Sequence, residues 1–326
     1  MSNRVLCLRP EADFARVDAL PPASLAVAYH APADPQVAGL MKASDALVIP
    51  AVGAKLAPDL FDGTSLRLVQ VTGIGVDRLD RPMLTRLGIP VANVAGGNNG
   101  AVVEYALTSA LVLLRRFVWA DAEIKAGRYD SFRARMVADN IGGLDGLLVG
   151  IVGFGTIGRA VAQAFHAMGC RICYHDPAAP DAALAARLDA QSMTLDALLA
   201  GADVVSLHVP LLPSTQNLIG AGELVRMKPG AVLIQGSRGG VVDEAALAAA
   251  LTSGRLGGAA VDVYSTEPPA ADNPLLKLTG DAARRLLLTP HIAGITRQSW
   301  GFLFRSAWQN VERVLIGNEP PLNRVY

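Results

Sequence analysis

The sequence predicts an α/β protein of two domains, the second of which is built on a doubly wound parallel sheet. The chain has 326 residues, enough for two domains at the usual size of about 150 residues each. Short apolar segments alternate along the chain with segments of helical length. In the second half these longer segments are rich in alanine and leucine, as crossover helices between parallel strands require.

Five short apolar runs predict the strands of the first domain, at residues 5–8, 25–29, 46–49, 68–71 and 90–93. Residues 101–118 then predict one long helix with a buried face. The arginine-rich stretch 125–140 that follows has no apolar face, so we expect an exposed arm there.

A second series of strands is predicted at residues 147–152, 171–174, 204–209, 231–235, 259–263 and 286–289. After this series, apolar residues recur at spacings of three and four between Trp300 and Leu315, which predicts one amphipathic helix. Because the second sheet is then complete, we expect this helix to return to the first domain. Its two tryptophans, Trp300 and Trp308, lie on the apolar stripe and are predicted to pack in the core.

Composition excludes several classes of function. The 29 basic and 29 acidic residues balance, and no cluster of Lys and Arg favours a nucleic-acid partner. The longest apolar stretch, at 106–120, contains Arg115 and Arg116 and is shorter than the roughly 20 residues of a membrane span. No secretory signal is expected at the N-terminus, and three cysteines do not form a disulfide framework. These features predict a cytoplasmic protein without a membrane partner.

The pair Cys170 and Cys173 has the spacing of a redox or metal site. However, Cys173 lies in the predicted strand 171–174 and Cys170 directly precedes it, and positions three apart on a strand face opposite sides of the sheet. The five histidines show no ligand spacing with one another or with acids. We therefore predict no metal.

The segment GFGTIG at 153–158 has the pattern of a dinucleotide-binding loop. Gly153 permits a tight turn after a strand, Gly155 lets the backbone approach a pyrophosphate, and Gly158 lets helix and strand pack closely. Asp176 ends the next strand, 18 residues after Gly158, near the expected position of the acid that binds a ribose diol. A carboxylate there repels a 2′-phosphate, which favours NAD over NADP.

Three polar residues follow other predicted strands: Arg238, Glu267 and His291. Because ligands of an open parallel sheet gather at the carboxyl ends of its strands, we expect all three to face one crevice. A guanidinium suits a carboxylate ligand, and a histidine paired with an acid suits proton transfer near neutral pH.

Taken together, the motifs resemble those of the D-isomer-specific 2-hydroxyacid dehydrogenases, either their glyoxylate/hydroxypyruvate reductase-like or their phosphoglycerate dehydrogenase-like members. The shared motifs are GFGTIG at 153–158, SRGGVVDE at 237–244, DVY at 262–264 with EP at 267–268, and TPHIAG at 289–294. The resemblance extends to GIGVD at 73–77, to residues 93–104 and to LHVPL at 207–211, so it covers essentially the whole chain.

The resemblance implies two Rossmann-like domains, with an NAD domain at 98–290 inserted into a flavodoxin-like substrate domain formed by 1–97 and 291–326. It implies that Arg238 binds the substrate carboxylate, that His291 is the acid and base, and that Glu267 supports His291. Backbone amides at Ile74 and Gly75 would bind the carboxylate, and Asn98 would lie near the nicotinamide. The long helix and the exposed arm resemble the dimer-forming elements of the family, which implies a homodimer.

The resemblance also implies a wider set of contacts with NAD. This set comprises Gly153, Gly155, Thr156, Ile157, Gly158, Asp176, His208, Val209, Pro210, Thr215, Gly236, Ser237, Arg238, Asp262, His291 and Gly294. Within it, Val209 and Pro210 would line the adenine side and Asp262 would meet the carboxamide. One departure from the family pattern is Gln235, which stands where the family often has asparagine.

The expected activity is therefore NAD(H)-dependent interconversion of a 2-keto acid and a D-2-hydroxy acid. The hydrophobic Ile74 and the small residues at 51–53 are compatible with a small acid such as glyoxylate or hydroxypyruvate. An alternative is an NAD(H)-sensing binding protein, because transcriptional corepressors use the same fold. Turnover of any keto acid above background distinguishes the two.

Overall fold

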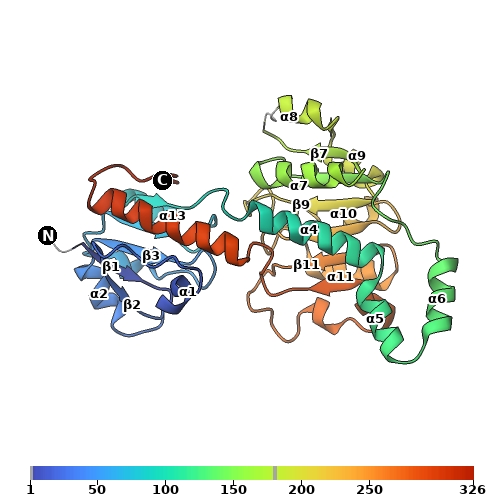
Figure 1. The fold of residues 1–326 in the computed structure, drawn as a ribbon, viewed down its shortest axis with the longest axis horizontal. Helices are drawn as coiled ribbons and strands as arrows, with labels where there is room; N and C mark the ends of the chain where they lie inside the picture. The colour runs from blue at the N-terminus through green and yellow to red at the C-terminus, as the bar shows by residue number, and fades with distance from the viewer. Residues whose placement is uncertain (1–2, 179–181) are drawn as a thin grey trace. The chain divides into compact units, whose positions relative to one another are not determined.

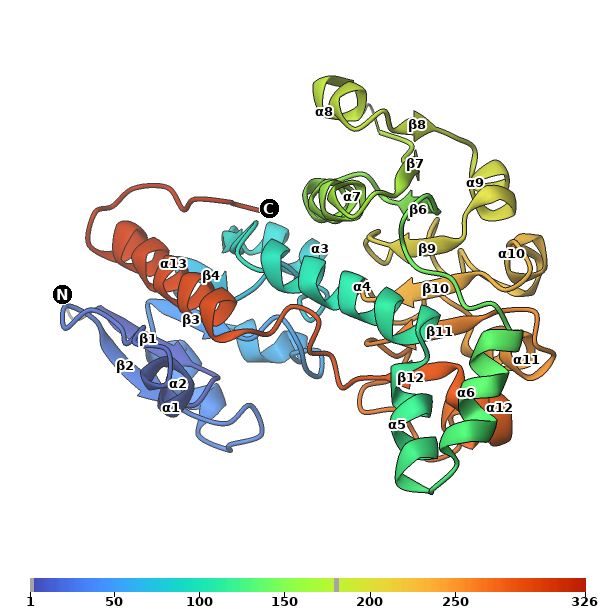
Figure 2. The same cartoon turned by 45° about the vertical axis from the view of Figure 1, so that its right-hand side comes forward.

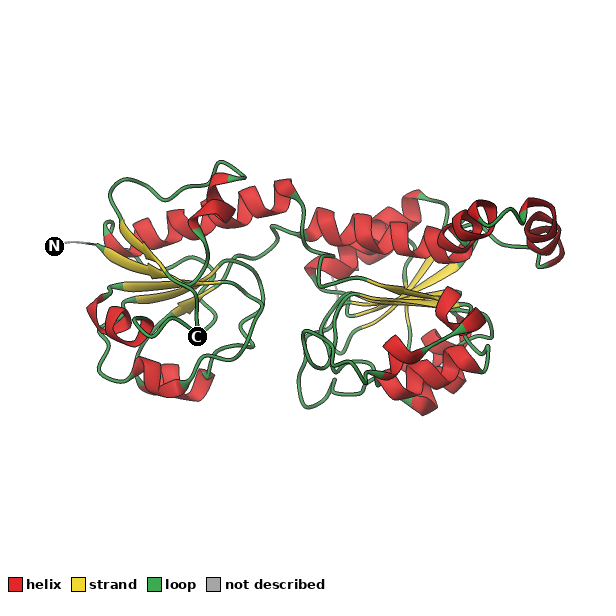
Figure 3. Ribbon diagram, turned by 90° about the horizontal axis from the view of Figure 1, so that it is seen from below, coloured by secondary structure: helices red, strands yellow, loops and turns green. Residues whose placement is uncertain are grey.

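A computed structural model describes residues 3–178 and 182–326. The chain divides into two compact units, one formed by Met1–Asn98 with Ile295–Tyr326 and the other by Asn99–Gly294. Each unit has a parallel sheet with helices on both faces (Figure 3). The predicted fold class, two doubly wound Rossmann-like α/β units, is confirmed.

The first unit has a five-stranded sheet in the order β2-β1-β3-β4-β5, with parallel pairing between all neighbours. This is the flavodoxin-like strand order. The strands are β1 (Arg4–Cys7), β2 (Ala26–Tyr29), β3 (Ala46–Ile49), β4 (Leu68–Val71) and β5 (Val91–Ala92). The helices are α1 (Glu11–Ala15), α2 (Val37–Ala43), α3 (Arg81–Arg86), the 3-10 helix η1 (Pro58–Phe61) and α13 (Arg297–Leu315).

The two faces of this sheet bury separate cores. Side chains of α1 and α13 pack on one face with alternate strand residues, including Val5, Cys7 and Val48. Side chains of α2, α3 and η1 pack on the other face, against the intervening strand residues such as Leu6 and Leu47. The alternation follows from the two-residue period of a strand, which directs neighbouring side chains to opposite faces.

Helix α13 belongs to the first unit although it follows the second unit in sequence, and it lies along this sheet (Figure 1). It begins at Thr296, whose side-chain hydroxyl accepts a hydrogen bond from the Ser299 amide at 3.0 Å. The predicted apolar stripe is buried, and Trp308 is only 2% exposed. The expected return of this helix to the first domain is therefore observed.

The second unit has a seven-stranded parallel sheet in the order β12-β11-β10-β9-β6-β7-β8. Its strands are β6 (Leu148–Val152), β7 (Arg171–His175), β8 (Gln191–Ser192), β9 (Val204–Leu207), β10 (Val232–Gln235), β11 (Gly258–Val261) and β12 (Leu286–Leu288). Its helices are α4 (Asn99–Leu114), α5 (Phe117–Lys125), α6 (Tyr129–Ala138), α7 (Thr156–Ala167), α8 (Ala182–Arg187), α9 (Leu195–Gly201), α10 (Ala221–Arg226), α11 (Glu244–Thr252), α12 (Gly280–Arg284) and the 3-10 helix η2 (Pro274–Lys277).

Helices also cover both faces of this second sheet. Side chains of α4, α7 and α8 share one core with residues of β6, β9, β10 and β11. Side chains of α9, α10 and α11 pack on the opposite face. Figure 2 shows the strand order running from β12 to β8, with α4 beside α7. The order of the strands reverses between β6 and β9, which makes this the topological switch point of the sheet.

The structure differs from the sequence prediction in three elements. The predicted helix 101–118 is two helices, because Arg116 takes a left-handed conformation (φ +53°) between α4 and α5. The predicted arm contains helix α6, whose amphipathic signal is weak because Phe132 is its one buried residue. The short strand β8 carried no apolar signal, since both of its residues are exposed.

The units divide after Asn98 and Gly294, whereas the sequence placed the divisions after residues 97 and 290. Residues 291–293 are held to the second unit by hydrogen bonds. The amide of His291 donates to the Asp262 carbonyl, and the amides of Ile292 and Ala293 donate to the Asp262 carboxylate, each at 2.8 Å. His291 therefore lies in the same unit as Arg238 and Glu267.

Within the described ranges, no helix is long and apolar enough to cross a membrane. All three cysteines are free and buried. Burial raises the pKa of Cys7 to about 12 and that of Cys170 and Cys173 to about 11. The thiols are therefore protonated at neutral pH, which disfavours nucleophilic or metal-binding chemistry at the Cys170 and Cys173 pair.

Candidate active site

The site residues predicted in the second unit follow the carboxyl ends of its strands. The glycine loop follows β6, Asp176 follows β7, His208, Val209, Pro210 and Thr215 follow β9, Gly236, Ser237 and Arg238 follow β10, Asp262 and Glu267 follow β11, and His291 and Gly294 follow β12. In a parallel sheet these ends share one edge, where ligands of doubly wound folds bind. The sheet thus brings together residues that are up to 141 positions apart in sequence.

Two of the three glycines of the 153–158 loop have a steric reason within the chain. Gly153 has φ +92°, and a Cβ there would lie 2.6 Å from the His208 carbonyl oxygen. A Cβ on Gly158 would lie 2.0 Å from the Gly153 carbonyl oxygen, so only glycine lets α7 approach the loop. At Gly155 a Cβ would meet no heavy atom within 4 Å.

The open space at Gly155 lies at the N-terminus of α7. Gly155 is the N-cap residue, and Thr156 and Ile157 form the first turn. The first amides of a helix have no partners within that helix and, with the helix dipole, favour an anion. The loop therefore fits a pyrophosphate, with Gly155, Thr156 and Ile157 as the residues that would hold it.

Asp176 lies beside this loop. Its Oδ2 accepts a hydrogen bond from the Phe154 amide at 2.6 Å, and its Oδ1 accepts one from the Ala178 amide at 2.8 Å. The carboxylate thus keeps a fixed position next to the pyrophosphate-binding loop while remaining partly exposed. This is the position from which a carboxylate binds the hydroxyls of a nucleotide ribose.

His208 is neutral in this environment. Its Nε2 lies 2.9 Å from the Ser206 hydroxyl, and burial lowers the pKa of His208 to about 4. The same strand end leads to Thr215, whose hydroxyl donates to the Pro210 carbonyl at 2.6 Å and accepts from the Leu212 amide at 2.8 Å. Thr215 therefore fixes the turn that carries Val209 and Pro210, and their contacts with the cofactor stay predictions.

His291 and Glu267 form the central pair of the site. His291 Nδ1 lies 2.7 Å from Glu267 Oε2, and both side chains are partly open to solvent, at 29% and 26% exposure. Glu267 Oε1 accepts a further hydrogen bond from the Tyr264 amide at 3.1 Å. With Nδ1 engaged by the carboxylate, Nε2 is the nitrogen of His291 that can exchange a proton with a ligand.

The charge state of Glu267 suits this pairing. Burial by itself would raise the pKa of Glu267, but the hydrogen bonds from His291 and from the Tyr264 amide outweigh it and hold the pKa below its usual value. The positive charge of Arg238 acts in the same direction. Glu267 is therefore ionised across the neutral range and can stabilise a protonated imidazole.

The loop of Arg238 is held by its neighbours. Gln235 accepts a hydrogen bond from the Ser237 hydroxyl at 2.8 Å and donates one to the Arg238 carbonyl at 2.8 Å. Gly239 packs so closely that a Cβ there would lie 1.7 Å from the Tyr264 carbonyl oxygen. These contacts bring the loop that carries Arg238 against the segment that leads to Glu267.

Asp262 has a role that sequence reasoning did not give it. It is 1% exposed, and its Oδ1 accepts from the Thr289 hydroxyl at 2.6 Å and from the Ile292 amide at 2.8 Å, while Oδ2 accepts from Ala293. Asp262 thus anchors the loop in which His291 adopts φ +55°. Its predicted contact with the carboxamide stays a prediction.

Two tyrosines complete this anchor and were missed from the sequence. The Tyr105 hydroxyl lies 3.0 Å from the Thr289 hydroxyl, and the Tyr264 hydroxyl donates to the Thr289 carbonyl at 3.0 Å. Burial raises the pKa of Tyr105 to about 12, so its phenol stays protonated. Tyr264 stands in the motif DVY, but Tyr105 on α4 carried no sequence signal, because only the fold places it beside Thr289.

Ile74, Gly75 and Asn98 belong to the first unit. The Ile74 carbonyl accepts a hydrogen bond from the Asn93 side chain at 2.7 Å, which fixes the loop after β4. The Oδ1 atom of Asn98 is buried without a hydrogen-bond partner among the described residues. The roles of these three residues toward a substrate stay predictions. Across 3–178 and 182–326, no group of three or more His, Cys, Asp or Glu side chains could hold a metal ion.

Comparison with known proteins identifies the family. Residues 107–293 match the family model described as D-isomer specific 2-hydroxyacid dehydrogenase, NAD binding domain, which is more than half of the chain. The chain belongs to this family. The match names NAD as the dinucleotide, and the glycine loop and Asp176 fit its pyrophosphate and ribose.

Two curated relatives of this chain differ in the share of their own length that the match covers. An (S)-sulfolactate dehydrogenase of Chromohalobacter salexigens is 38% identical over 249 residues, 76% of this chain and 76% of the relative. A D-3-phosphoglycerate dehydrogenase of Archaeoglobus fulgidus is 36% identical over 235 residues, 72% of this chain but only 42% of the relative. The match therefore spans less than half of the phosphoglycerate enzyme.

Solved structures of similar proteins match the chain over nearly its full length. The TT0316 protein from Thermus thermophilus has 30% identity and a TM-score of 0.83, covering 99% of this chain and 100% of that one. A D-lactate dehydrogenase from Treponema pallidum has 27% identity and a TM-score of 0.81, covering 99% of both chains. The fold of both units is thus a known fold of this family.

Proposed function

We propose that the chain catalyses the NAD(H)-dependent interconversion of a 2-keto acid and a D-2-hydroxy acid. The observation that carries the proposal is the 2.7 Å contact between His291 and Glu267 at the same sheet edge as Arg238. An acid and base, a carboxylate that supports it and a guanidinium are the groups that reduction of a keto acid needs from a protein. The family relationship supports the same reaction.

In the reductive direction, Arg238 binds the substrate carboxylate and lies where negative charge develops on the carbonyl oxygen. His291 in its protonated form donates a proton to that oxygen, and Glu267 stabilises the imidazolium. NADH, held by the glycine loop and Asp176, would supply the hydride for carbon C2. Asp262, Thr289 and Tyr105 hold the loop that carries His291, so the imidazole keeps one position during proton transfer.

We propose that the first unit binds the substrate and the second binds NAD. The amides of Ile74 and Gly75 would receive the substrate carboxylate, and Asn98 would approach the nicotinamide. We further propose a small acid such as glyoxylate or hydroxypyruvate, since residues 51–53 after β3 are Ala, Val and Gly. The buried free thiols support a reducing, cytoplasmic compartment.

The test of this function is NADH consumption with a panel of 2-keto acids: glyoxylate, hydroxypyruvate, pyruvate, phenylpyruvate and 2-ketogluconate. We expect turnover with at least one small acid and a much lower rate with NADPH. If NADH binds but no acid turns over, the enzymatic proposal fails and the NAD(H)-sensing alternative gains support. The names of the two curated relatives specify phosphoglycerate and sulfolactate as their substrates. The corresponding keto acids, 3-phosphohydroxypyruvate and sulfopyruvate, therefore complete the panel.

Changing Asp176 to asparagine is expected to weaken the preference for NADH over NADPH. Asparagine keeps an oxygen that can accept from the Phe154 amide, but it removes the charge that binds the ribose diol and repels a 2′-phosphate. Hydrogen bonds to charged groups are worth about 1.5–3 kcal/mol, so the KM for NADH is expected to rise roughly 10- to 100-fold. Steady-state kinetics with both cofactors measures this, and an unchanged NADH to NADPH ratio would contradict the role of Asp176.

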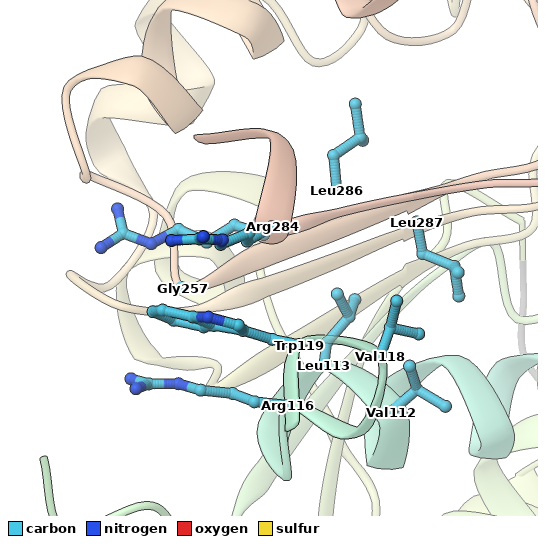
Figure 4. A pocket seen from close by; sticks show the side chains of 10 residues that line it. Val112, Leu113, Arg116, Val118, Trp119, Gly257, Arg284, Leu286 and Leu287 are labelled. Atoms are coloured by element: carbon cyan, nitrogen blue, oxygen red, sulfur yellow. The ribbon is translucent and has the colours of Figure 1, made fainter. Parts of the chain in front are cut away.

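We also propose that the chain forms a homodimer through α4, α5 and α6. The last two of these helices expose large apolar side chains, which are Phe117 (53%), Val118 (62%), Ile124 (48%), Tyr129 (58%) and Val137 (68%). A pocket beside them is lined by Val112, Leu113, Val118, Leu286 and Leu287 (Figure 4). At its rim Trp119 lies between the guanidinium groups of Arg116 and Arg284. Exposed apolar patches of this kind are typical of protein interfaces.

Changing Val118 to aspartate is expected to convert a dimer into a monomer, because a charge would be buried in the apolar interface. Val225 on α10 is the matched control, since it is 67% exposed in the same unit but lies on the other face of the sheet. Light scattering after size exclusion is expected to give about twice 34.0 kDa for the unchanged chain and for Val225→Asp. A monomeric unchanged chain would contradict the proposal.

A further inference from the structure

The carboxyl edge of the sheet in the first unit carries two neighbouring loops. The strand order β2-β1-β3-β4-β5 reverses between β1 and β3, so this edge is the topological switch point at which doubly wound sheets bind ligands. The β3 loop, residues 50–57, follows β3, and the β4 loop, residues 72–78, follows β4. The β4 loop includes Ile74 and Gly75, the proposed amide donors to the substrate carboxylate.

The β3 loop has little support of its own. It has no helix or strand before η1, residues 52–55 are exposed, and Val52 is 43% exposed. Gly53 takes φ +126°, a conformation that other residues rarely adopt. A loop of this kind needs external hydrogen bonds to keep one conformation.

Arg78 provides those hydrogen bonds. Its Nε donates to the Ala54 carbonyl at 2.8 Å and its Nη1 to the Pro50 carbonyl at 3.0 Å, while its own carbonyl accepts from the Leu56 amide at 3.1 Å. The guanidinium also packs on Gly53, since a Cβ there would lie 3.2 Å from Arg78 Cζ. One side chain thus contacts the β3 loop at its start and at its apex.

The burial of Arg78 is unusual for a charged group. It is 5% exposed, and no carboxylate in the described ranges forms an ion pair with it. Burial lowers the pKa of Arg78 from its usual value, yet arginine remains charged in proteins. The main-chain carbonyls of the β3 loop are therefore the groups that compensate its charge, and this couples the conformation of the loop to Arg78.

The β4 loop that carries Arg78 is itself fixed. Asn93, just after β5, donates to the Ile74 carbonyl at 2.7 Å, and Val94 donates through its amide to the Gly73 carbonyl at 3.0 Å. Asn93 thus fixes the β4 loop to the end of β5, and Arg78 ties the β3 loop to the β4 loop. The distance between the β3 loop and the amides of Ile74 and Gly75 follows from these contacts.

We propose that Arg78 is a specificity-determining positioning residue, which holds the β3 loop at a set distance from Ile74 and Gly75 and so limits the room for the side chain of the 2-keto acid. This inference rests on the proposed function. It concerns which 2-keto acids are accepted, since Arg78 takes no part in the proton transfer assigned to His291.

The chain offers a matched control in Arg67. This arginine also donates to main-chain carbonyls in the first unit, from Nη2 to Val314 at 2.6 Å and from Nη1 to Leu315 at 3.2 Å. It precedes β4, at the opposite end of that strand from Arg78. Arg67→Met therefore removes a comparable set of hydrogen bonds at the edge away from the proposed site.

The first experiment compares amide hydrogen exchange of residues 50–57 in the unchanged chain, Arg78→Met and Arg67→Met. We expect exchange in this segment to be at least tenfold faster in Arg78→Met only. Arg78→Lys keeps the charge but places all its donors on one nitrogen, so its exchange is expected to fall between that of Arg78→Met and that of the unchanged chain. Equal exchange in all variants overturns the proposal. If Arg78→Met does not fold, the comparison of Arg78→Lys with Arg67→Lys gives the same test.

The second experiment measures kcat/KM for glyoxylate, pyruvate, 2-ketobutyrate and phenylpyruvate, with NADH affinity determined separately. We expect the ratio of the preferred small acid to phenylpyruvate to fall at least tenfold in Arg78→Met, with NADH affinity unchanged and with no change of the ratio in Arg67→Met. An unchanged ratio in Arg78→Met, with turnover intact, overturns the inference alone. Absence of turnover with every acid in the unchanged chain overturns the proposed function and the inference with it.

Discussion

Changing His291 to asparagine is expected to lower kcat at least about 1000-fold, within the range that general acid catalysis contributes. Glu267 holds Nδ1 of His291 at 2.7 Å, so in the proposed mechanism the other nitrogen of His291 is the proton donor to the carbonyl oxygen. Asparagine can still accept or donate a hydrogen bond, but it cannot transfer a proton near neutral pH. Steady-state kinetics with the best keto acid of the panel measures the loss.

Measuring the affinity for NADH shows whether the loss of kcat in His291→Asn comes from lost proton transfer or from a disturbed structure. The glycine loop and Asp176, which are proposed to hold the cofactor, follow other strands, so the Kd for NADH is expected to stay within about twofold, which is less than 0.5 kcal/mol. His166→Asn is the control, because His166 is an exposed residue in the last turn of α7. Retention of more than a tenth of the activity in His291→Asn would contradict the assigned role.

Glu267→Gln extends this prediction within the same pair. Glutamine keeps an oxygen and an amide near His291 and the Tyr264 amide, but it removes the negative charge that stabilises the imidazolium. An intermediate loss of kcat is expected, roughly 10- to 100-fold, the worth of a charged hydrogen bond of about 1.5–3 kcal/mol. The pH profile of kcat/KM is the second readout, because the variant lacks the negative charge beside His291.

Changing Arg238 to glutamine is expected to lower kcat/KM for the keto acid about 1000-fold, equivalent to roughly 4 kcal/mol of transition-state stabilisation. Arg238 lies in the loop that follows β10 at the carboxyl edge of the sheet. Its positive charge helps to lower the pKa of Glu267. In the proposed mechanism, loss of the guanidinium removes both the partner of the substrate carboxylate and the charge that stabilises the developing oxyanion. Both KM and kcat are therefore expected to change.

Arg238→Lys distinguishes charge from geometry. Lysine restores the positive charge but not the planar fork that binds a carboxylate with two parallel hydrogen bonds, so only part of the activity is expected to return. Arg226→Gln is the control, since Arg226 is an exposed residue paired with Glu223 at 2.8 Å. If the variant lost only NADH affinity and kept its kcat/KM for the keto acid, Arg238 would be assigned to binding the cofactor and not the substrate.

Most strands and the site motifs were predictable because their signals are local. The apolar runs, such as those of β3 and β4, coincide with the observed strands. Gly153 and Gly158 of the 153–158 loop each have a steric reason that applies to any strand, turn and helix of this kind. The apolar stripe from Trp300 to Leu315 predicted α13 and its burial. Periodicity and turn chemistry are properties of a short segment, so the sequence displays them directly.

The elements that the sequence did not predict lack such local signals. Strand β8 has no apolar residue at its two positions, and α6 buries only Phe132. The break between α4 and α5 depends on the left-handed conformation of Arg116, a residue that is usually helical. In each case contacts with the rest of the unit, and not the local residues, determine the conformation.

The sequence by itself determined that this is a doubly wound α/β protein with a dinucleotide-binding loop, and it predicted Arg238, Glu267 and His291 as site residues. Only the tertiary structure decided what holds these groups: Asp262 beneath the His291 loop, Tyr105 on Thr289, Gln235 in the Arg238 loop and Arg78 across the two loops of the first unit. The physical reason is that a motif depends on the order of residues along the chain. A hydrogen bond between distant residues depends on the sheet that brings them together, as it brings Tyr105 within 3.0 Å of Thr289.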